Sequence, residues 1–289
     1  TAEGVLTIAR AHRLGGTVGL LPTVVTDRPE IIRRAAEAVL AVWGQEGVLG
    51  IHIEGPHINP IRKGAHNPRF IRPLDCETLD LIESLRACRL PVMLTLAPEM
   101  VEPGQIAELV KLGVIVSAGH TDATADQVET AIAEGLSCFT HLYNGMSQIT
   151  AREPGVVGKA LISDQPCGII ADGYHVDKRV LQLAFDIPKR RGRIFVVSDA
   201  MATWNGPDHF DLYGERIKLS GGKLVNQEGV LSGAHIDMAR CVSNLLDFGI
   251  PAAEALAAAT TVPAGTIGLP RIGTLLGANQ SSLVLIGQI

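Results

Sequence analysis

Side chains that can bind metals or transfer protons recur in this sequence directly after short apolar segments. The first is Glu54, which ends the run IHIE just before Gly55-Pro56. The others, with their motifs, are Glu99 in TLAPE, His120 in SAGH, His141 in THLY, Asp172 and His175 in ADGYH, and Asp199 in VSDA. One such residue is usually a structural group, but imidazoles and carboxylates at successive segment ends predict a shared site.

A divalent metal is the first chemistry that these residues suggest. His120 and His141 with one carboxylate would form the three-ligand set that a catalytic metal such as zinc uses. Residue types alone leave open whether Glu54 or Glu99 supplies the carboxylate. No His-X-His motif occurs, so the sequence offers no histidine pair for a second metal. His52 forms only a His-X-Glu with Glu54, and we expect it to have a structural or supporting role.

Asp199 is the candidate for proton transfer. It follows the apolar run Phe195-Val196-Val197, and burial beside such a run raises the pKa of a carboxyl group toward the range useful for acid and base catalysis. The alternative is that Asp199 only caps the turn that follows it.

Arg152 is the candidate for binding an anion. It lies in the loop sequence ITAREPG, where a guanidinium could hold a phosphate or carboxylate through two parallel hydrogen bonds. Asn144 and Gly145, shortly before it, could donate amides to the same anion. The alternative is a solvated loop arginine without a ligand.

Apolar segments and helical periods alternate along the chain, which is typical of parallel βα units. We expect seven strands, at 18–25, 50–54, 92–96, 114–118, 137–142, 167–171 and 194–198. Periodicity predicts helices at 1–14, 28–43, 75–88, 103–112, 123–133 and 177–189, with Thr26-Asp27 capping the second. With one more strand upstream of Thr1, these units would form a (β/α)8 TIM-type barrel, whose active site lies where its strands end.

The pattern changes after residue 198. Turn signals between 212 and 231 predict an inserted hairpin, and helices return at 236–248 and 252–259. The last apolar run, 282–286, reads as a strand with no helix after it. We therefore expect a hydrolase barrel over residues 1–271 and, over 272–289, a strand segment of a small β-domain.

Composition excludes several classes of function. The 25 basic and 30 acidic residues give a formal net charge of −5, and we interpret the one basic cluster, residues 189–193, as a solvated helix end. Nucleic-acid binding is therefore not expected. No apolar run approaches the roughly 18 residues that cross a membrane. The 5 scattered cysteines lack a Cys-X-X-Cys pair, which predicts reduced thiols and a cytoplasmic protein.

Eight motifs, in this order, resemble the N-acetylglucosamine-6-phosphate deacetylase family of the amidohydrolase superfamily: HIEGPHINPIRKGAHNP, TLAPEM, SAGHTDAT, THLYNGM, ITAREPG, GIIADGYHVD, VSDAM and GVLSGA. The resemblance implies an amidohydrolase barrel with a small β-sandwich domain, whose N-terminal part and first barrel strand would precede Thr1. It also implies metal-dependent hydrolysis of the acetamide of N-acetylglucosamine 6-phosphate to glucosamine 6-phosphate and acetate.

The resemblance further implies roles for single residues. Glu54, His120 and His141 would bind one divalent metal, with zinc expected and iron or manganese as alternatives, and Glu99 would be a supporting residue. Asp199 would be the catalytic acid and base, and His175 would donate to the developing oxyanion. The implied substrate contacts are Ala65, His66, Asn144, Gly145, Arg152, Asp172, His175, Leu231, Ser232 and Gly233. A homodimer is implied as well.

Two alternatives stay open. The substrate could be a related N-acyl amino-sugar phosphate, such as the galactosamine epimer, because sequence does not resolve the contacts that read the sugar hydroxyls. The chain could also be a non-catalytic sugar-phosphate-binding protein, which would bind its ligand without metal dependence or acetate release. One departure from the family is His57, which stands where bulky apolar residues are common.

Overall fold

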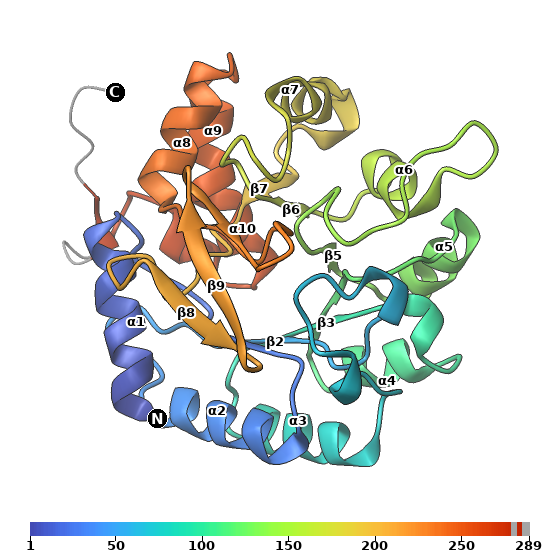
Figure 1. The fold of residues 1–289 in the computed structure, drawn as a ribbon. Coiled ribbons are helices and arrows are strands. Elements are labelled where there is room, and N and C mark those ends of the chain that lie inside the picture. Colours follow the sequence, from blue (N-terminus) through green and yellow to red (C-terminus); the bar gives the residue numbers. More distant parts are fainter. Residues whose placement is uncertain (279–281, 285–289) are drawn as a thin grey trace.

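The computed structural model describes residues 1–278 and 282–284 (Figure 1). Its centre is a curled sheet of parallel strands that are hydrogen-bonded in chain order. These are β1 (Thr23–Val25), β2 (Ile51–Glu54), β3 (Val92–Leu96), β4 (Ile115–Ala118), β5 (Cys138–Phe139), β6 (Cys167–Ile169) and β7 (Ile194–Val196). This sheet fits a TIM-type barrel, as expected from the sequence. The eighth strand and the small β-domain stay predictions.

Helices surround the curled sheet in Figure 1. They are α1 (Ala2–Leu14), α2 (Pro29–Ala41), α3 (Cys76–Ala87), α4 (Gln105–Lys111), α5 (Ala125–Glu134), α6 (Gly155–Ile162), α7 (Lys178–Asp186), α8 (Met238–Asp247), α9 (Ala252–Ala259) and α10 (Thr261–Thr266). Every helix expected from periodicity is present. Sequence reasoning missed α6 and α10, because the glycines of α6 and the proline and glycine of α10 are unfavourable in helices.

Side chains of the sheet alternate between the helices and the barrel interior. All five residues of β3 are buried, as is usual for a parallel strand covered on both faces. On β2, Ile51 and Ile53 share one face and His52 and Glu54 share the other, as expected from the sequence. The register pairs Glu54 with Thr95 of β3, so polar groups of neighbouring strands meet inside the barrel.

The expected insertion is a three-stranded antiparallel sheet rather than a single hairpin. It consists of β8 (His209–Leu212), β9 (Glu215–Ser220) and β10 (Lys223–Val225), with β9 in the middle. It begins three residues earlier than the expected bound at 212. In Figure 1 it lies in front of the barrel strands, near the end of β2.

Two local interpretations of the sequence need correction. In the basic cluster 189–193, Lys189 and Arg191 are exposed as expected, but Arg190 is only 1% exposed, and its guanidinium donates to the carbonyl oxygens of Gln165 and Ser163. Neither Thr26 nor Asp27 is the N-cap of α2, which is Arg28 without a side-chain hydrogen bond. The side chains of Arg190 and Thr26 instead bond partners that are distant in sequence.

The expected C-terminal strand 282–286 falls partly outside the described residues. Residues 282–284 are described and are not in a strand, whereas 285 and 286 are not described. The division at residue 271 and the β-domain segment over 272–289 therefore stay predictions.

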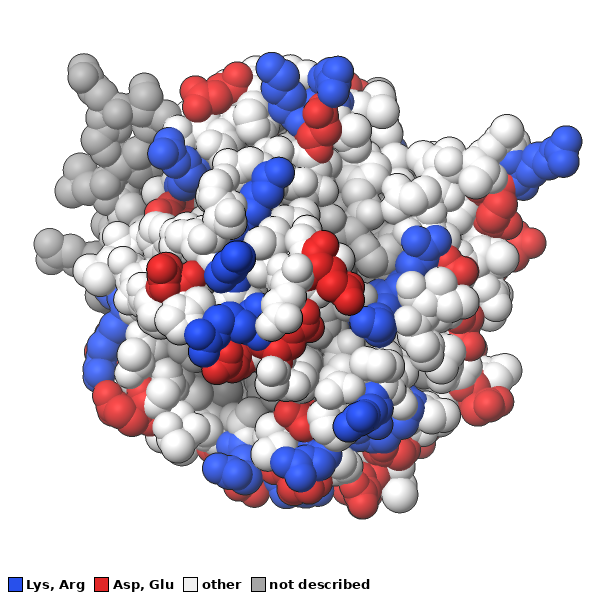
Figure 2. Space-filling view, in the orientation of Figure 1, with Lys and Arg blue, Asp and Glu red and all other residues white. Residues whose placement is uncertain are grey.

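Basic and acidic side chains are interspersed on the face shown in Figure 2, with no continuous basic patch. All 5 cysteines are free, as expected. Among the helices of residues 1–278 and 282–284, none is both long enough and apolar enough to cross a membrane.

Candidate active site

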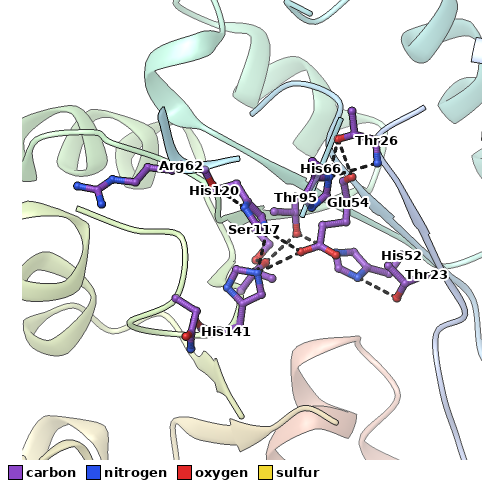
Figure 3. Close-up of polar contacts among 12 residues, drawn as sticks. Thr23, Thr26, His52, Glu54, Arg62, His66, Thr95, Ser117, His120 and His141 are labelled. Atoms are coloured by element: carbon purple, nitrogen blue, oxygen red, sulfur yellow. Dashed lines mark hydrogen bonds and ion pairs between the residues drawn. The ribbon is translucent and has the colours of Figure 1, made fainter. Parts of the chain in front are cut away.

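Three predicted ligands converge where the barrel strands end. Nε2 of His120 and Nε2 of His141 each lie 3.1 Å from Oε1 of Glu54. All three residues are buried, and in the described part of the chain they form a group whose ligand atoms lie within 4.8 Å of one another. Figure 3 shows the two imidazoles pointing at the Glu54 carboxylate. The group fits a divalent cation, since two imidazoles and one carboxylate are a common catalytic donor set.

The backbone of Arg62 sets the tautomer of His120. Nδ1 of His120 lies 2.8 Å from the carbonyl oxygen of Arg62, which can only accept a hydrogen bond. Nδ1 therefore carries the proton, and the lone pair of Nε2 faces Glu54 and His141. The guanidinium of Arg62 is held in turn by Asp122, with Nε 2.7 Å from Oδ1.

Three functional candidates have strained backbones. His120, His141 and Asp199 have φ angles of 49°, 32° and 47°, in the left-handed region that residues other than glycine seldom adopt. Such residues persist only where the surrounding structure holds them, and they cluster at functional sites. The strain therefore supports the site independently of the residue types.

The cluster has the electrostatics of a cation site. Burial by itself would raise the pKa of Glu54, but the close contacts of its carboxylate with the imidazoles of His120 and His141 hold that pKa well below its usual range. Burial opposes the charging of His141 too, yet its hydrogen bond to Glu54 raises its pKa. Glu54 is thus kept as a carboxylate, the form that binds a metal.

Asp199 follows β7 and faces the cluster. Burial, followed by the negative charge of Glu54, raises the pKa of Asp199 to about 6. The backbone oxygen of Asp199 accepts a hydrogen bond of 2.9 Å from Ala234, which holds residues 231–234 beside it. A carboxyl group with this pKa can both accept and donate a proton near neutral pH.

His175 is oriented by Asp172. Nδ1 of His175 lies 2.6 Å from Oδ2 of Asp172, and Oδ1 of Asp172 accepts the backbone N–H groups of Tyr174 and His175. These bonds lower the pKa of Asp172 against the effect of its burial. The carboxylate therefore holds Nδ1, and Nε2 of His175 is left for another partner.

Glu99, the other carboxylate candidate for the metal, is engaged elsewhere. Its Oε1 accepts hydrogen bonds from Asn59 Nδ2 at 2.9 Å and from Asp122 N at 2.6 Å, and its Oε2 accepts one from Thr121 Oγ1 at 2.6 Å. Glu99 therefore ties the loop after β2 to the loop after β4. The geometry selects Glu54 for the metal group and leaves Glu99 a supporting role.

Hydroxyl groups bond both ring nitrogens of His52 within the barrel, and a series of further hydroxyls continues from one of them (Figure 3). His52 Nε2 lies 2.8 Å from Thr95 Oγ1, and its Nδ1 lies 3.1 Å from Thr23 Oγ1. Thr95 continues to Thr140 at 2.7 Å, and Thr140 to Ser117 at 2.6 Å. Both ring nitrogens of His52 are thus satisfied away from Glu54, which agrees with the structural role expected for it.

Several candidates for substrate binding lie against the cluster. The ring of His66 meets that of His120 with centroids 4.4 Å apart, and Ala65 directly precedes it. A side chain at Gly145 would come within 3.0 Å of His120 Nδ1, so this glycine allows the close approach. Asn144 caps the turn after His141, with its N–H 3.0 Å from the His141 carbonyl oxygen.

Arg152 and residues 231–233 are placed differently. Arg152 is exposed, and among the described residues its guanidinium has no ion pair or hydrogen bond. Leu231, Ser232 and Gly233 lead from the inserted sheet to Ala234, the residue that bonds Asp199. The structure therefore places 231–233 beside Asp199 and, within its described part, leaves Arg152 as a free cation on a surface loop.

The sequence does not indicate that Arg62 or Thr26 contacts the site. Arg62 contributes a backbone oxygen, and Thr26 Oγ1 lies 2.7 Å from His66 Nδ1. The only sequence feature that could have indicated Arg62 is its place inside the motif HINPIRKGAH. The sequence pattern around Thr26 predicts a helix cap instead. His57 is a structural residue, since its nitrogens lie 3.1 Å from Arg72 O and 3.1 Å from Thr78 Oγ1.

Comparison with known proteins supplies the family. The pattern of the Amidohydrolase family matches residues 1–286. An N-acetylgalactosamine-6-phosphate deacetylase of Shewanella sp. (strain ANA-3) is 38% identical over 98% of this chain and 73% of its own length. An N-acetylglucosamine-6-phosphate deacetylase of Haemophilus influenzae is 32% identical over 90% of this chain and 69% of its own length.

Solved structures of deacetylases have a fold similar to that of this chain. The crystal structure of N-acetylglucosamine-6-phosphate deacetylase from Pasteurella multocida superposes with a TM-score of 0.87 at 33% identity, over 94% of this chain and 72% of that one. The same enzyme from Mycobacterium smegmatis, a mutant in complex with N-acetyl-D-glucosamine-6-phosphate, gives a TM-score of 0.80 at 30% identity, over 92% and 71% of the two chains.

Proposed function

This chain belongs to the amidohydrolase family, and we propose that it is an N-acetylglucosamine-6-phosphate deacetylase, which hydrolyses the acetamide to glucosamine 6-phosphate and acetate. The observation that carries the proposal is the buried group of Glu54, His120 and His141 beside a carboxyl group, Asp199, whose pKa is about 6. The names of the relatives supply the substrate class.

Glu54, His120 and His141 would hold one divalent metal. When bound, such a metal supplies a water of lowered pKa and a Lewis acid for the amide carbonyl. Zinc is the expected ion, and iron or manganese would also suit two imidazoles and one carboxylate, with availability deciding among them.

Asp199 would move the protons of the reaction. As a carboxylate it takes a proton from the attacking water, and as an acid it returns that proton to the nitrogen of the departing amine. Its raised pKa suits both steps, because the group changes its charge close to neutral pH.

His175 would stabilise the carbonyl oxygen as it becomes negative. Asp172 fixes the ring through Nδ1 and so directs Nε2, which would donate to that oxygen when the ring is an imidazolium paired with the Asp172 carboxylate. The step needs no movement of the ring, since the hydrogen bond from Asp172 already holds its orientation.

The sugar phosphate would be bound by residues that surround the cluster. We assign the sugar to Ala65 and His66 and to the turn of Asp172 and His175, and the phosphate to Arg152 with Asn144 and Gly145. Leu231, Ser232 and Gly233 would cover the ligand from the inserted sheet. A homodimer and a cytoplasmic location stay predictions of the family resemblance.

Deacetylation of the galactosamine epimer is a second candidate function. It is favoured by the 38% identity to a relative with that name. The test is acetate release from the two 6-phosphates by the metal-loaded protein, each compared by kcat/KM. A higher kcat/KM for the glucosamine epimer supports the main proposal, and the reverse order would replace it. Binding of either sugar phosphate without acetate release would indicate the non-catalytic alternative.

A further inference from the structure

The inserted sheet is fastened to the barrel by a tyrosine at its β8–β9 turn. The phenol of Tyr213 donates a hydrogen bond to the carbonyl oxygen of Thr26, the residue directly after β1. The ring of Tyr213 also packs against Phe70, with centroids 6.2 Å apart. Tyr213 is half-buried by these contacts, and burial raises the pKa of its phenol, so the hydroxyl remains a donor. The turn therefore rests on the end of β1.

Tyr213 occupies a turn position that disfavours tyrosine. Leu212 pairs with Glu215, which leaves Tyr213 and Gly214 as a two-residue loop with φ angles of 53° and 83°. Positive φ at both positions defines the hairpin turn in which asparagine, aspartate and glycine are favoured. A bulky side chain there is a genuine outlier. The contacts of its side chain with Thr26 and Phe70 offset the strain. These contacts, and not the conformation of the turn, therefore explain why tyrosine is found at this position.

Thr26 connects this turn to His66. Thr26 Oγ1 lies 2.7 Å from Nδ1 of His66, and the Thr26 N–H lies 3.4 Å from the same nitrogen (Figure 3). Because a backbone N–H can only donate, Nδ1 accepts and Nε2 carries the ring proton. Thr26 is fully buried and His66 is 6% exposed. Thr26 thus accepts the hydrogen bond of Tyr213 at its carbonyl oxygen, and it orients the imidazole of His66 with its hydroxyl and backbone N–H groups.

We propose that Tyr213 is a positioning residue for sugar recognition: from the inserted sheet it holds the backbone of Thr26 and thereby fixes the ring of His66 beside His120. The inference rests on the proposed function, in which His66 binds the sugar, and extends it to the insertion. The orientation of the His66 ring that binds the sugar would then depend on a contact between Thr26 and Tyr213, which are 187 residues apart in sequence.

An exposed side-chain pair within the inserted sheet provides a control. Arg216 of β9 lies opposite Asp211 of β8, and its Nε donates to Asp211 Oδ1 at 3.1 Å. Arg216→Ala therefore removes one side-chain hydrogen bond of the same sheet without touching the path through Thr26.

The experiment measures kcat and KM of the metal-loaded full chain. We expect Tyr213→Phe to raise KM for N-acetylglucosamine 6-phosphate by about two- to tenfold, the factor of one net hydrogen bond, while kcat and Tm change little. Thr26→Val should raise KM by a similar factor, because it removes the hydroxyl that bonds His66. Thr26→Ser, which keeps a hydroxyl, should have a KM close to that of the wild type. If the two groups act along one path, the double variant Tyr213→Phe with Thr26→Val will cost no more than the worse single variant. Arg216→Ala should leave KM unchanged.

Other results would overturn the proposal. An unchanged KM in Tyr213→Phe, an equal rise in Arg216→Ala, or full additivity in the double variant would each show that Tyr213 does not act through Thr26. A readout that needs no turnover separates this from the proposed function: Tyr213→Phe should shift the side-chain ¹⁵N resonances of His66, and Arg216→Ala should not. If the wild-type chain released no acetate, the proposed function would fail, while those resonances would still decide the role of Tyr213.

Discussion

The Nε2 atoms of His120 and His141, 21 residues apart in sequence, lie 3.0 Å from each other. Each also contacts the same oxygen of Glu54, and the proton of His120 is committed to Nδ1 by the Arg62 carbonyl oxygen. Two imidazole nitrogens this close repel each other unless a proton or a cation lies between their lone pairs. The arrangement therefore favours a positive charge between the two rings. Both residues adopt strained φ angles to reach it.

Glu54→Gln should weaken metal binding by more than the roughly 10- to 100-fold expected for loss of a group that only supports a ligand, because it removes a charged ligand. The measurement is metal content after dialysis together with the rise in Tm on adding zinc, since a ligand that binds the folded state stabilises it. Glu99→Gln is the control, because its oxygens bind Asn59, Thr121 and Asp122 instead. An equal loss of metal in both variants would contradict the assignment of Glu54.

Asp199→Asn should lower kcat by about 10²- to 10⁴-fold, the usual contribution of a positioned acid or base. The amide keeps the shape of the side chain but cannot take a proton. Metal content and binding of glucosamine 6-phosphate, measured by calorimetry, should remain. Acetate release within tenfold of the wild-type rate would mean that another group moves the proton.

Activity should fall as the pH drops through about 6. Burial raises the pKa of Asp199 to about 6, and only the carboxylate can accept the proton of the attacking water. A bound cation favours the carboxylate, so the acidic limb of kcat/KM in the metal-loaded enzyme should lie at or below this pH. The profile is measured between about pH 4.5 and about pH 8 at saturating metal. Activity that rises on acidification, or a limb above about pH 7, would rule out this role.

His57→Phe should make the stability less dependent on pH. Burial lowers the pKa of His57, so below the ordinary value of 6.5 the unfolded chain binds a proton that the folded chain does not. Stability is therefore lost as the pH falls through 6.5. Removing the imidazole should reduce the difference in unfolding free energy between about pH 7.5 and about pH 5 by up to about 2 kcal/mol, measured by urea denaturation. An unchanged difference would mean that His57 is protonated in the fold.

Arg152→Ala should raise KM for N-acetylglucosamine 6-phosphate by about ten- to hundredfold, the factor of a charge-assisted contact, and should affect unphosphorylated N-acetylglucosamine little. The arginine is exposed and, among the described residues, its guanidinium has no partner that would compete for it. Arg191→Ala, at another exposed arginine, is the control. Equal effects on both substrates would place the phosphate elsewhere.

The sequence was sufficient to predict a barrel of parallel βα units and, apart from the choice between Glu54 and Glu99, the residues that meet in the buried group. Alternating short apolar segments and helical periods specify parallel strands, and parallel strands in one sheet all end at the same edge. Glu54, His120 and Asp199 could therefore be placed near one another without knowledge of any distance between them. The family resemblance then chose Glu54 over Glu99.

Tertiary structure alone showed the physical ground for that choice. Glu54 and Glu99 both follow barrel strands, and only the contacts of Glu99 with Asn59, Thr121 and Asp122 show that its oxygens are occupied. Those partners come from loops after two other strands, so no local pattern could reveal them.

The sequence by itself thus determined which residues lie at the carboxyl ends of the strands, because strand and helix periods are local properties. The structure decided what each side chain does there. Thr26 looks like a helix cap in sequence but binds His66, and Tyr213 looks like part of an ordinary turn but binds Thr26. Hydrogen-bond partners in a barrel come from strands and insertions far apart in the chain, and only the folded arrangement brings them together.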